Sequence, residues 1–212
     1  MATAAFIVVA YLIGSVSFAV IVSRAFRLPD PRTFGSGNPG ATNVLRTGRK
    51  LAALLTLVGD GGKGWLAVFL AGRYAADYGL DATGVAGCAV AVFLGHLFPV
   101  YFGFRGGKGV STAAGVLLAI HPWLGLATIA TWIIIAVFFR YSSLAAIVSA
   151  VFAPIYAFFM SLLGFELGSM PAAVVLLAAL LIWRHKTNIL NLVAGKERRI
   201  GEKRDSASAL RS

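Results

Sequence analysis

Long apolar stretches separated by short polar breaks run through most of the chain. We place the apolar stretches at about residues 2–23, 51–73, 83–103, 110–120, 122–139, 143–163 and 171–184. A helix needs about 20 apolar residues to cross the roughly 30 Å hydrocarbon core of a bilayer. The pattern therefore predicts an all-α integral membrane protein with seven transmembrane helices, some of them short.

The fourth stretch, residues 110–120, is the shortest. His121-Pro122 ends it, because proline lacks an amide donor and restricts the residue before it. A helix of that length rises only about 16 Å, so we expect it to cross part of the bilayer. We expect one membrane domain over residues 1–200 and a flexible basic tail over residues 202–212.

The composition supports a membrane protein. Hydrophobic residues make up 58% of the 212 positions and charged residues 13%, and the mean hydropathy is +0.83. Charged residues make up about 25% of a typical soluble domain, so a soluble fold is excluded. The single cysteine, Cys88, lies in an apolar run and allows no internal disulfide.

The basic residues are distributed unevenly between the two predicted sides. Of 19 Lys and Arg, six flank the first loop, two lie in the third, one follows the fifth span and eight lie between Arg184 and Arg211. The positive-inside rule then places the N-terminus outside and the C-terminus in the cytoplasm. The net charge of +11 suits anionic lipid head groups, and no nucleic-acid partner is expected.

Three polar, glycine-rich segments fall on the predicted cytoplasmic side. The first motif, residues 35–46, reads GSGNPGATNVLR. It is either an ordinary connecting loop or a site for phosphate or carboxylate, with Arg46 as the cationic fork.

The second motif, residues 95–112, reads GHLFPVYFGFRGGKGVST. Its glycine–lysine loop, residues 106–109, is expected to bind an anion through backbone amides and Lys108. It is not a nucleotide-binding P-loop, because Gly109 follows Lys108 where that pattern needs Ser or Thr. His96 is either a catalytic group or a hydrogen-bonding group at a helix end.

The third motif, residues 184–201, reads RHKTNILNLVAGKERRIG. It is either a basic amphipathic segment on the lipid surface or part of the site, with His185 and Asn188 on one helical face. Asp60-Gly61-Gly62-Lys63-Gly64 is expected to interrupt the second span, with Asp60 and Lys63 paired for a structural or functional reason. Ser143 is either a helix cap or a site residue.

These three segments resemble the signature motifs of the acyl-phosphate-dependent glycerol-3-phosphate acyltransferases of bacteria, the PlsY family. The opening YLIGSVSF and the RYSSL turn at residues 140–144 resemble the family as well, and the match covers nearly the whole chain in order. Asn191 departs from it, because the family often has a basic residue there.

The resemblance implies a bacterial inner-membrane enzyme that moves an acyl chain from acyl phosphate to the sn-1 hydroxyl of glycerol 3-phosphate. Lysophosphatidic acid and phosphate would be its products, on the cytoplasmic face, with no cofactor or metal. The oligomeric state stays open, and a monomer is compatible with the resemblance. The expected catalytic residues are Ser36, Arg46, Lys108, His185 and Asn188. The expected substrate-binding residues are Gly37, Asn38, Gly40, Asn43, His96, Gly106, Gly107, Gly109 and Ser143, whereas Asp60, Lys63 and Glu197 are structural or unassigned.

The proton acceptor stays open between His185, His96 and a substrate phosphate. A transporter of a phosphorylated anion is the rival function, because broken helices and glycine loops suit it too. A transporter needs polar groups at the bilayer midplane, whereas these motifs lie at one face. The sequence therefore favours an enzyme.

Overall fold

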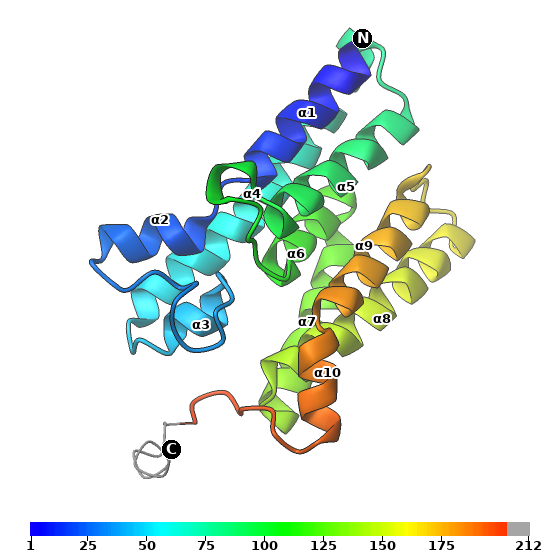
Figure 1. Cartoon of the computed structure of the whole chain (residues 1–212). Coiled ribbons are helices and arrows are strands. Elements are labelled where there is room, and N and C mark those ends of the chain that lie inside the picture. Colours follow the sequence, from blue (N-terminus) through cyan, green and yellow to red (C-terminus); the bar gives the residue numbers. More distant parts are fainter. Residues whose placement is uncertain (203–212) are drawn as a thin grey trace, which may run out of the picture.

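The structure is a computed structural model that describes residues 1–202 (Figure 1). Within that range every regular element is a helix. Apart from Glu202, the predicted flexible tail lies outside the described residues. The helices are α1 (Ala2–Gly14), α2 (Phe18–Ala25), α3 (Ala41–Leu45), α4 (Lys50–Tyr78), α5 (Ala82–Leu97), the 3-10 turn η1 (Val100–Phe102), α6 (Val110–Ile120), α7 (Pro122–Phe139), α8 (Ser142–Leu162), α9 (Met170–Arg184) and α10 (Lys186–Val193).

The prediction of an all-helical, multi-pass membrane fold is confirmed at this level. Five segments are long and apolar enough to cross a membrane, and α9 with α10 gives a sixth if the bent pair is one span. Helix α6 is apolar but shorter, and it begins and ends where the sequence predicts. Seven crossings, the direction of the termini and a single domain stay predictions.

The first predicted span runs as one candidate from Ala2 to Ala25, but its helix is interrupted at residues 15–17. Helix α1 ends at Gly14 and α2 begins at Phe18, so the carbonyl of Val16 has no helical partner. The Nζ atom of Lys63 on α4 donates a hydrogen bond of 2.6 Å to that carbonyl. A buried side chain from another helix therefore stabilises the break.

Residues 60–64 do not interrupt the second span, so that expectation was wrong. Helix α4 is continuous from Lys50 to Tyr78. Its glycines allow close packing instead, because a Cβ on Gly64 would collide with the carbonyl of Thr112 on α6. A Cβ on Gly115 of α6 would likewise collide with the carbonyl of Gly61. Glycine here brings two helix backbones together, as small residues do in membrane bundles.

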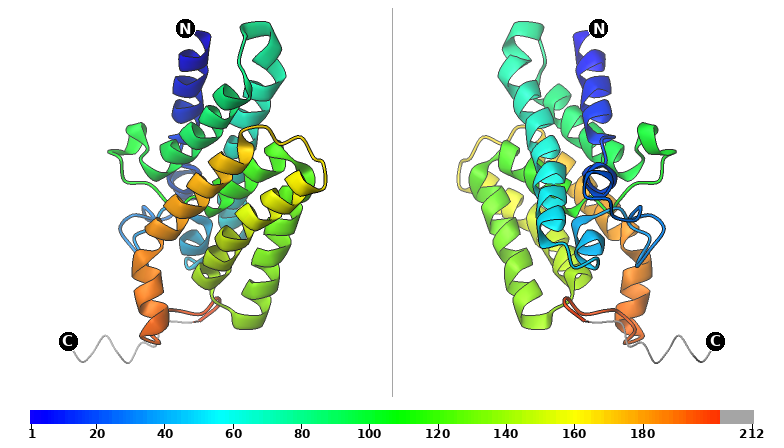
Figure 2. Two further views of the ribbon diagram at one scale, coloured as in Figure 1. Left: turned by 90° about the vertical axis from the view of Figure 1, so that its right-hand side faces the viewer. Right: turned by 90° about the vertical axis from the view of Figure 1, so that its left-hand side faces the viewer.

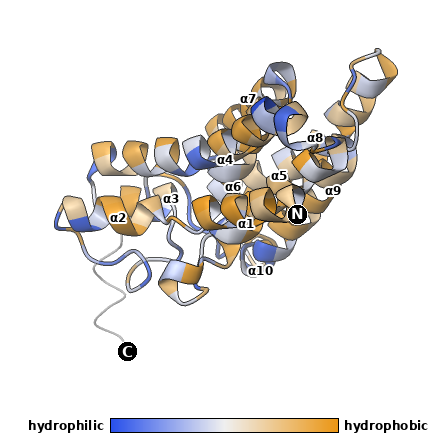
Figure 3. Cartoon of the chain, turned by 90° about the horizontal axis from the view of Figure 1, so that it is seen from above, coloured by the Kyte–Doolittle hydropathy of each residue, from blue (hydrophilic) through white to orange (hydrophobic). Residues whose placement is uncertain are grey.

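The helices pack in neighbouring pairs, chiefly α4 with α6, α1 with α5, α7 with α8, and α8 with α9. The largest buried side chains include Phe93 and Leu97 of α5 and Leu124 of α7. Figure 2 shows the N-terminus at one end of the bundle and α10 at the other. Seen from above in Figure 3, apolar residues dominate the long helices, and polar residues gather in connecting segments and near α10.

Candidate active site

A chain of hydrogen bonds joins the second motif to the third and to α8. The Nζ atom of Lys108 donates to the Oδ1 atom of Asn188. The Nδ2 atom of Asn188 donates to Glu197 Oε1 over 2.7 Å, and the hydroxyl of Ser143 donates to the same oxygen over 2.6 Å. Four polar side chains from three parts of the chain therefore lie in one array.

A bend at His185 gives the third motif its position. Helices α9 and α10 meet there at an angle of 58°, and His185 stands between them, three residues before Asn188 on α10. His185 is 3% exposed, and its Nδ1 atom lies 2.8 Å from the carbonyl of Leu181. A carbonyl only accepts, so Nδ1 carries the proton and Nε2 is unprotonated in the neutral ring.

The first motif is organised around Asn43, which is 2% exposed. Its Nδ2 atom donates to the carbonyls of Pro31 and Phe34 over 2.8 and 3.1 Å. Its Oδ1 atom accepts the backbone amide of Ser36 over 3.0 Å and faces Nη1 of Arg46 at 3.4 Å. Every hydrogen-bonding position of this amide is occupied by the loop itself. Asn43 therefore places Ser36 and Arg46, and has no donor left for substrate.

We predict that Asn43→Ala lowers the free energy of unfolding by about 1–3 kcal/mol, because it leaves buried backbone groups without partners. Thermal unfolding in detergent measures this. Thr33→Ala is the matched control, since its hydroxyl bond to the Asp30 carbonyl is exposed and an exposed change of this kind stays within about 0.5 kcal/mol. Equal effects of the two substitutions would contradict the assignment.

The first motif also reaches the other two. The hydroxyls of Thr42 and Ser142 lie 3.1 Å apart, which joins α3 to the start of α8 beside Ser143. The carbonyl of Pro39 lies next to Gly107. Ser36, Gly37 and Arg46 are exposed, whereas Asn38 and Gly40 are half-buried. All three motifs thus meet at the same end of the bundle.

The site is strongly cationic around one carboxylate. Burial lowers the pKa of Lys108, whereas the Glu197 carboxylate raises it and the guanidinium groups of Arg184 and Arg46 lower it further. Burial and Arg198 lower the pKa of Arg46, and Glu197 opposes them. An anion brought among these groups would gain attraction from several charges at once.

The glycines of the glycine–lysine loop pack against the end of α5. A Cβ on Gly106 would collide with the carbonyls of His96 and Leu97, and one on Gly107 would collide with the His96 ring. The amide of Gly107 already donates to the His96 carbonyl over 3.2 Å. That amide is therefore not free for phosphate, in contrast to the expectation from the sequence. Gly109 caps α6 at φ +85°, a conformation that favours glycine.

His96, Asp60 and Lys63 form a buried polar network behind this loop. Lys63 Nζ lies 2.9 Å from Asp60 Oδ1, and His96 Nδ1 lies 3.6 Å from the same oxygen. The hydroxyl of Thr112 lies 3.1 Å from His96 Nδ1 and donates to the Asp60 carbonyl over 3.0 Å. His96 is thus enclosed by protein, which favours its reading as a hydrogen-bonding group at the helix end.

Sequence reasoning missed Arg184 as a site residue. Its guanidinium donates to the carbonyls of Gly106 and Gly107. The only signal in the sequence is its place directly before His185, and basic residues at helix ends are common.

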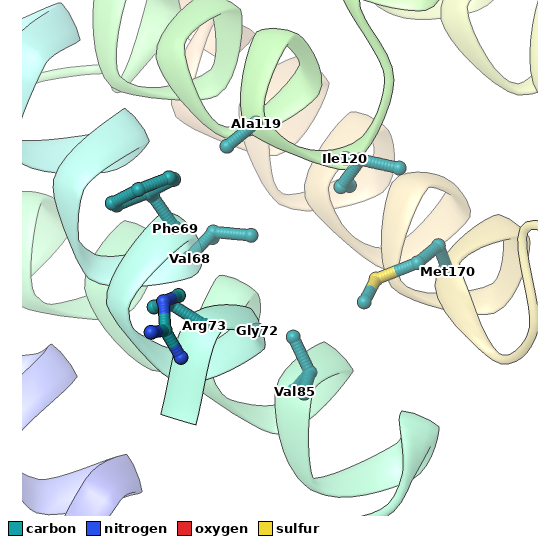
Figure 4. Close-up of a pocket in the computed structure, with 8 residues that line it drawn as sticks. All are labelled: Val68, Phe69, Gly72, Arg73, Val85, Ala119, Ile120 and Met170. Atoms are coloured by element: carbon teal, nitrogen blue, oxygen red, sulfur yellow. The ribbon is translucent and has the colours of Figure 1, made fainter. Parts of the chain in front are cut away.

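A cavity of about 320 Å³ lies away from the motif residues (Figure 4). It opens near the end of α6, between α4, α5 and α9, and apolar side chains such as Val68, Ile120 and Met170 line it together with Arg73. Among the described residues, no cluster of His, Cys, Asp or Glu could hold a metal ion.

Comparison with known proteins identifies the family. The Glycerol-3-phosphate acyltransferase family profile matches residues 4–195. The chain belongs to this family. A glycerol-3-phosphate acyltransferase of Cupriavidus pinatubonensis is 65% identical over 204 residues, covering 96% of this chain and 99% of that protein. One from Ralstonia pickettii is 64% identical over 207 residues, covering 98% of each.

Solved structures agree with this assignment to the PlsY family. A crystal structure of PlsY (YgiH), an integral membrane glycerol 3-phosphate acyltransferase in its glycerol 3-phosphate form, has a TM-score of 0.83. It is 33% identical and covers 100% of both chains. A lysophosphatidic acid form is 34% identical, covers 95% of this chain and 96% of that one, and has the same TM-score of 0.83.

Proposed function

We propose that this protein transfers a fatty acyl chain from acyl phosphate to the sn-1 hydroxyl of glycerol 3-phosphate. The products are lysophosphatidic acid and inorganic phosphate. The observation that carries the proposal is the hydrogen-bonded array of Lys108, Asn188, Glu197 and Ser143, in a chain of this family. Three arginines, at positions 46, 184 and 198, lie around this array. Both substrates carry phosphate, so a cationic site of this kind suits both.

The reaction needs no protein nucleophile. An acyl phosphate is a mixed anhydride, and the glycerol oxygen attacks its carbonyl carbon. A carbon–oxygen bond forms, the carbon–oxygen bond to phosphate breaks, and phosphate leaves with the electron pair. The hydroxyl proton passes to an acceptor. The protein contributes proximity and stabilisation of charge on the oxygens.

We assign the residues as follows. Lys108 and Arg46 bind phosphate oxygens, Ser36 and Asn38 orient substrate, and Asn43 holds the first motif in shape. Glu197 orients Asn188 and Ser143, which it contacts directly. The glycines at positions 37 and 40 let the first motif approach the substrate, and those at positions 106, 107 and 109 let the second motif pack on α5.

Both histidine rings are buried, and His185 is the proton acceptor in this proposal because it lies near Lys108 and Glu197. Its Nδ1–H bond to Leu181 leaves Nε2 unprotonated, whereas Asp60, Thr112 and Gly107 surround the His96 ring. A substrate phosphate oxygen is the remaining acceptor. The variant His185→Gln distinguishes the two acceptors. If a substrate phosphate accepts the proton, the turnover number of this variant should depend on pH as that of the wild type does. If His185 accepts the proton, the pH dependence should change.

The direct test uses purified protein with palmitoyl phosphate and glycerol 3-phosphate. We expect lysophosphatidic acid acylated at the sn-1 position, and equal moles of phosphate. Acyl-coenzyme A in place of palmitoyl phosphate should give no product. Product from the thioester alone would refute the proposed donor.

We further propose seven crossings of the bacterial inner membrane, with all three motifs on the cytoplasmic side. The charge distribution along the sequence supports this orientation.

We predict that single cysteines at Arg49 and Lys196 react with a membrane-impermeant thiol reagent only after cells are permeabilised. A cysteine at Asp77 should react in intact cells. All three positions are exposed, and the variants are made in a Cys88→Ala background because Cys88 is the only native thiol. Labelling of positions 49 and 196 from opposite sides would contradict the topology.

A further inference from the structure

Arg184 donates hydrogen bonds to the two residues that precede Lys108. Its Nη2 atom donates to the carbonyls of Gly106 and Gly107 over 3.1 Å each, and its Nε atom donates to the Gly107 carbonyl over 3.3 Å. A planar guanidinium can bind two adjacent carbonyls in this way, and an ammonium cannot reproduce the fork. The side chain at the end of α9 therefore fixes the backbone of the glycine–lysine loop.

Aromatic rings hold the guanidinium in place. Its Cζ atom lies 5.7 Å from the centroid of the Phe98 ring and 5.9 Å from that of Trp183. The carbonyl of Phe98 accepts a hydrogen bond of 2.6 Å from the hydroxyl of Tyr11 on α1, which ties this ring's segment to the bundle. The orientation of Arg184 is thus set by packing before any substrate binds.

The opposite side of the loop is held by His96. The amide of Gly107 donates to the His96 carbonyl, and the His96 ring leaves no room for a side chain at position 107. Gly106 and Gly107 are both buried. The loop backbone is therefore fixed between α5 and α9, directly before the residue that carries the charge.

Lys108 itself reaches the other side of the bend. Its side chain donates to Asn188 on α10, whereas the two preceding carbonyls bind Arg184 at the end of α9. The loop thus bridges the 58° bend between these helices. A shift of the loop backbone would move Lys108 away from Asn188.

We propose that Arg184 is a positioning residue that acts through Lys108, by holding the Gly106 and Gly107 carbonyls so that the ammonium group faces Asn188 and the substrate phosphate. Three of its N–H donors are engaged by these carbonyls, so its charge acts on the loop first. The proposal rests on the proposed function, since it assumes that Lys108 binds phosphate.

The test is a double-mutant cycle on the initial rate with palmitoyl phosphate and glycerol 3-phosphate. We expect Arg184→Ala to lower kcat/KM about 100-fold, the scale of a misplaced catalytic group. The Arg184→Ala/Lys108→Ala double variant should be no slower than Lys108→Ala alone, because Arg184 acts through Lys108. Arg184→Lys should recover only part of the loss.

Arg73→Ala is the matched control, because Arg73 is an exposed cation on α4 that lies outside the three motifs. It should keep kcat/KM within about twofold, because an exposed change away from the site usually has little effect. If the effects of Arg184→Ala and Lys108→Ala multiply in the double variant, Arg184 acts on substrate independently and the proposal is overturned. Wild-type kcat/KM in Arg184→Ala would overturn it too.

Two readouts separate other failures. If Arg184→Ala does not insert or fold, the same cycle is run with Arg184→Lys, whose loss should again disappear in the Lys108→Ala background. A wild-type protein that makes no lysophosphatidic acid would sink the proposed function. If the wild-type protein is active and the effects of the Arg184 and Lys108 substitutions multiply, only the inference about Arg184 is refuted.

Discussion

Lys108→Ala should lower kcat/KM by a factor of about 10²–10³, or about 3–4 kcal/mol of transition-state stabilisation, the scale seen when one preorganised electrostatic donor is removed. Burial lowers the pKa of Lys108, Glu197 raises it, and Arg184 and Arg46 lower it further. An incoming phosphate adds negative charge beside the ammonium group and is attracted by it. The alanine variant lacks this attraction for the phosphate groups of both substrates.

Initial rates over a grid of both substrate concentrations measure this effect, with circular dichroism and thermal unfolding as checks on the fold. Lys108→Arg is the informative comparison, because it keeps the charge but changes the shape of the donor group. Lys186→Ala is the control, since it removes an exposed cation from the start of α10. An alanine variant at position 108 with near-normal kcat/KM would exclude Lys108 from phosphate binding.

The helix ends were predictable where glycine or proline in the local sequence starts or ends a helix. Gly109 and His121-Pro122 bound α6, and the structure places its ends at Val110 and Ile120. The break at residues 15–17 was not predictable, because Gly, Ser and Thr are common inside membrane helices, where they let helices pack closely. The partner of the Val16 carbonyl is Lys63, 47 positions away, and no local pattern records such a contact.

The same distinction applies to the candidate site. The three motifs carry strong signals, because glycines, asparagines and cations have no reason to gather in a lipid-facing segment. The sequence could not tell an amide that binds substrate from one that holds a loop. These contacts join segments that are distant in the sequence, so they are visible only in the structure. They are the hydrogen bonds of Asn43, the bonded amide of Gly107 and the hydrogen bonds from Arg184 to the loop carbonyls.

The buried pair of Asp60 and Lys63 carries the largest expected effect on stability. Lys63→Met keeps most of the side-chain volume but leaves the Asp60 carboxylate buried, with only the His96 ring, at 3.6 Å, as an ionisable neighbour. Removing one partner of a buried ion pair destabilises a protein by about 3–5 kcal/mol, and we expect a loss of that order in the free energy of unfolding in detergent. The Val16 carbonyl also loses its donor.

The double variant Asp60→Asn/Lys63→Met should be more stable than Lys63→Met alone, because no uncompensated charge remains. The free energy of unfolding of the double variant should still be about 1–3 kcal/mol below that of the wild type, because the Val16 carbonyl stays unpaired at the break between α1 and α2. Reversible unfolding of the three proteins in one detergent measures both differences. A double variant less stable than Lys63→Met would mean that Asp60 is stabilised without Lys63. His96, which the Thr112 hydroxyl contacts, would then be the side chain that holds the carboxylate.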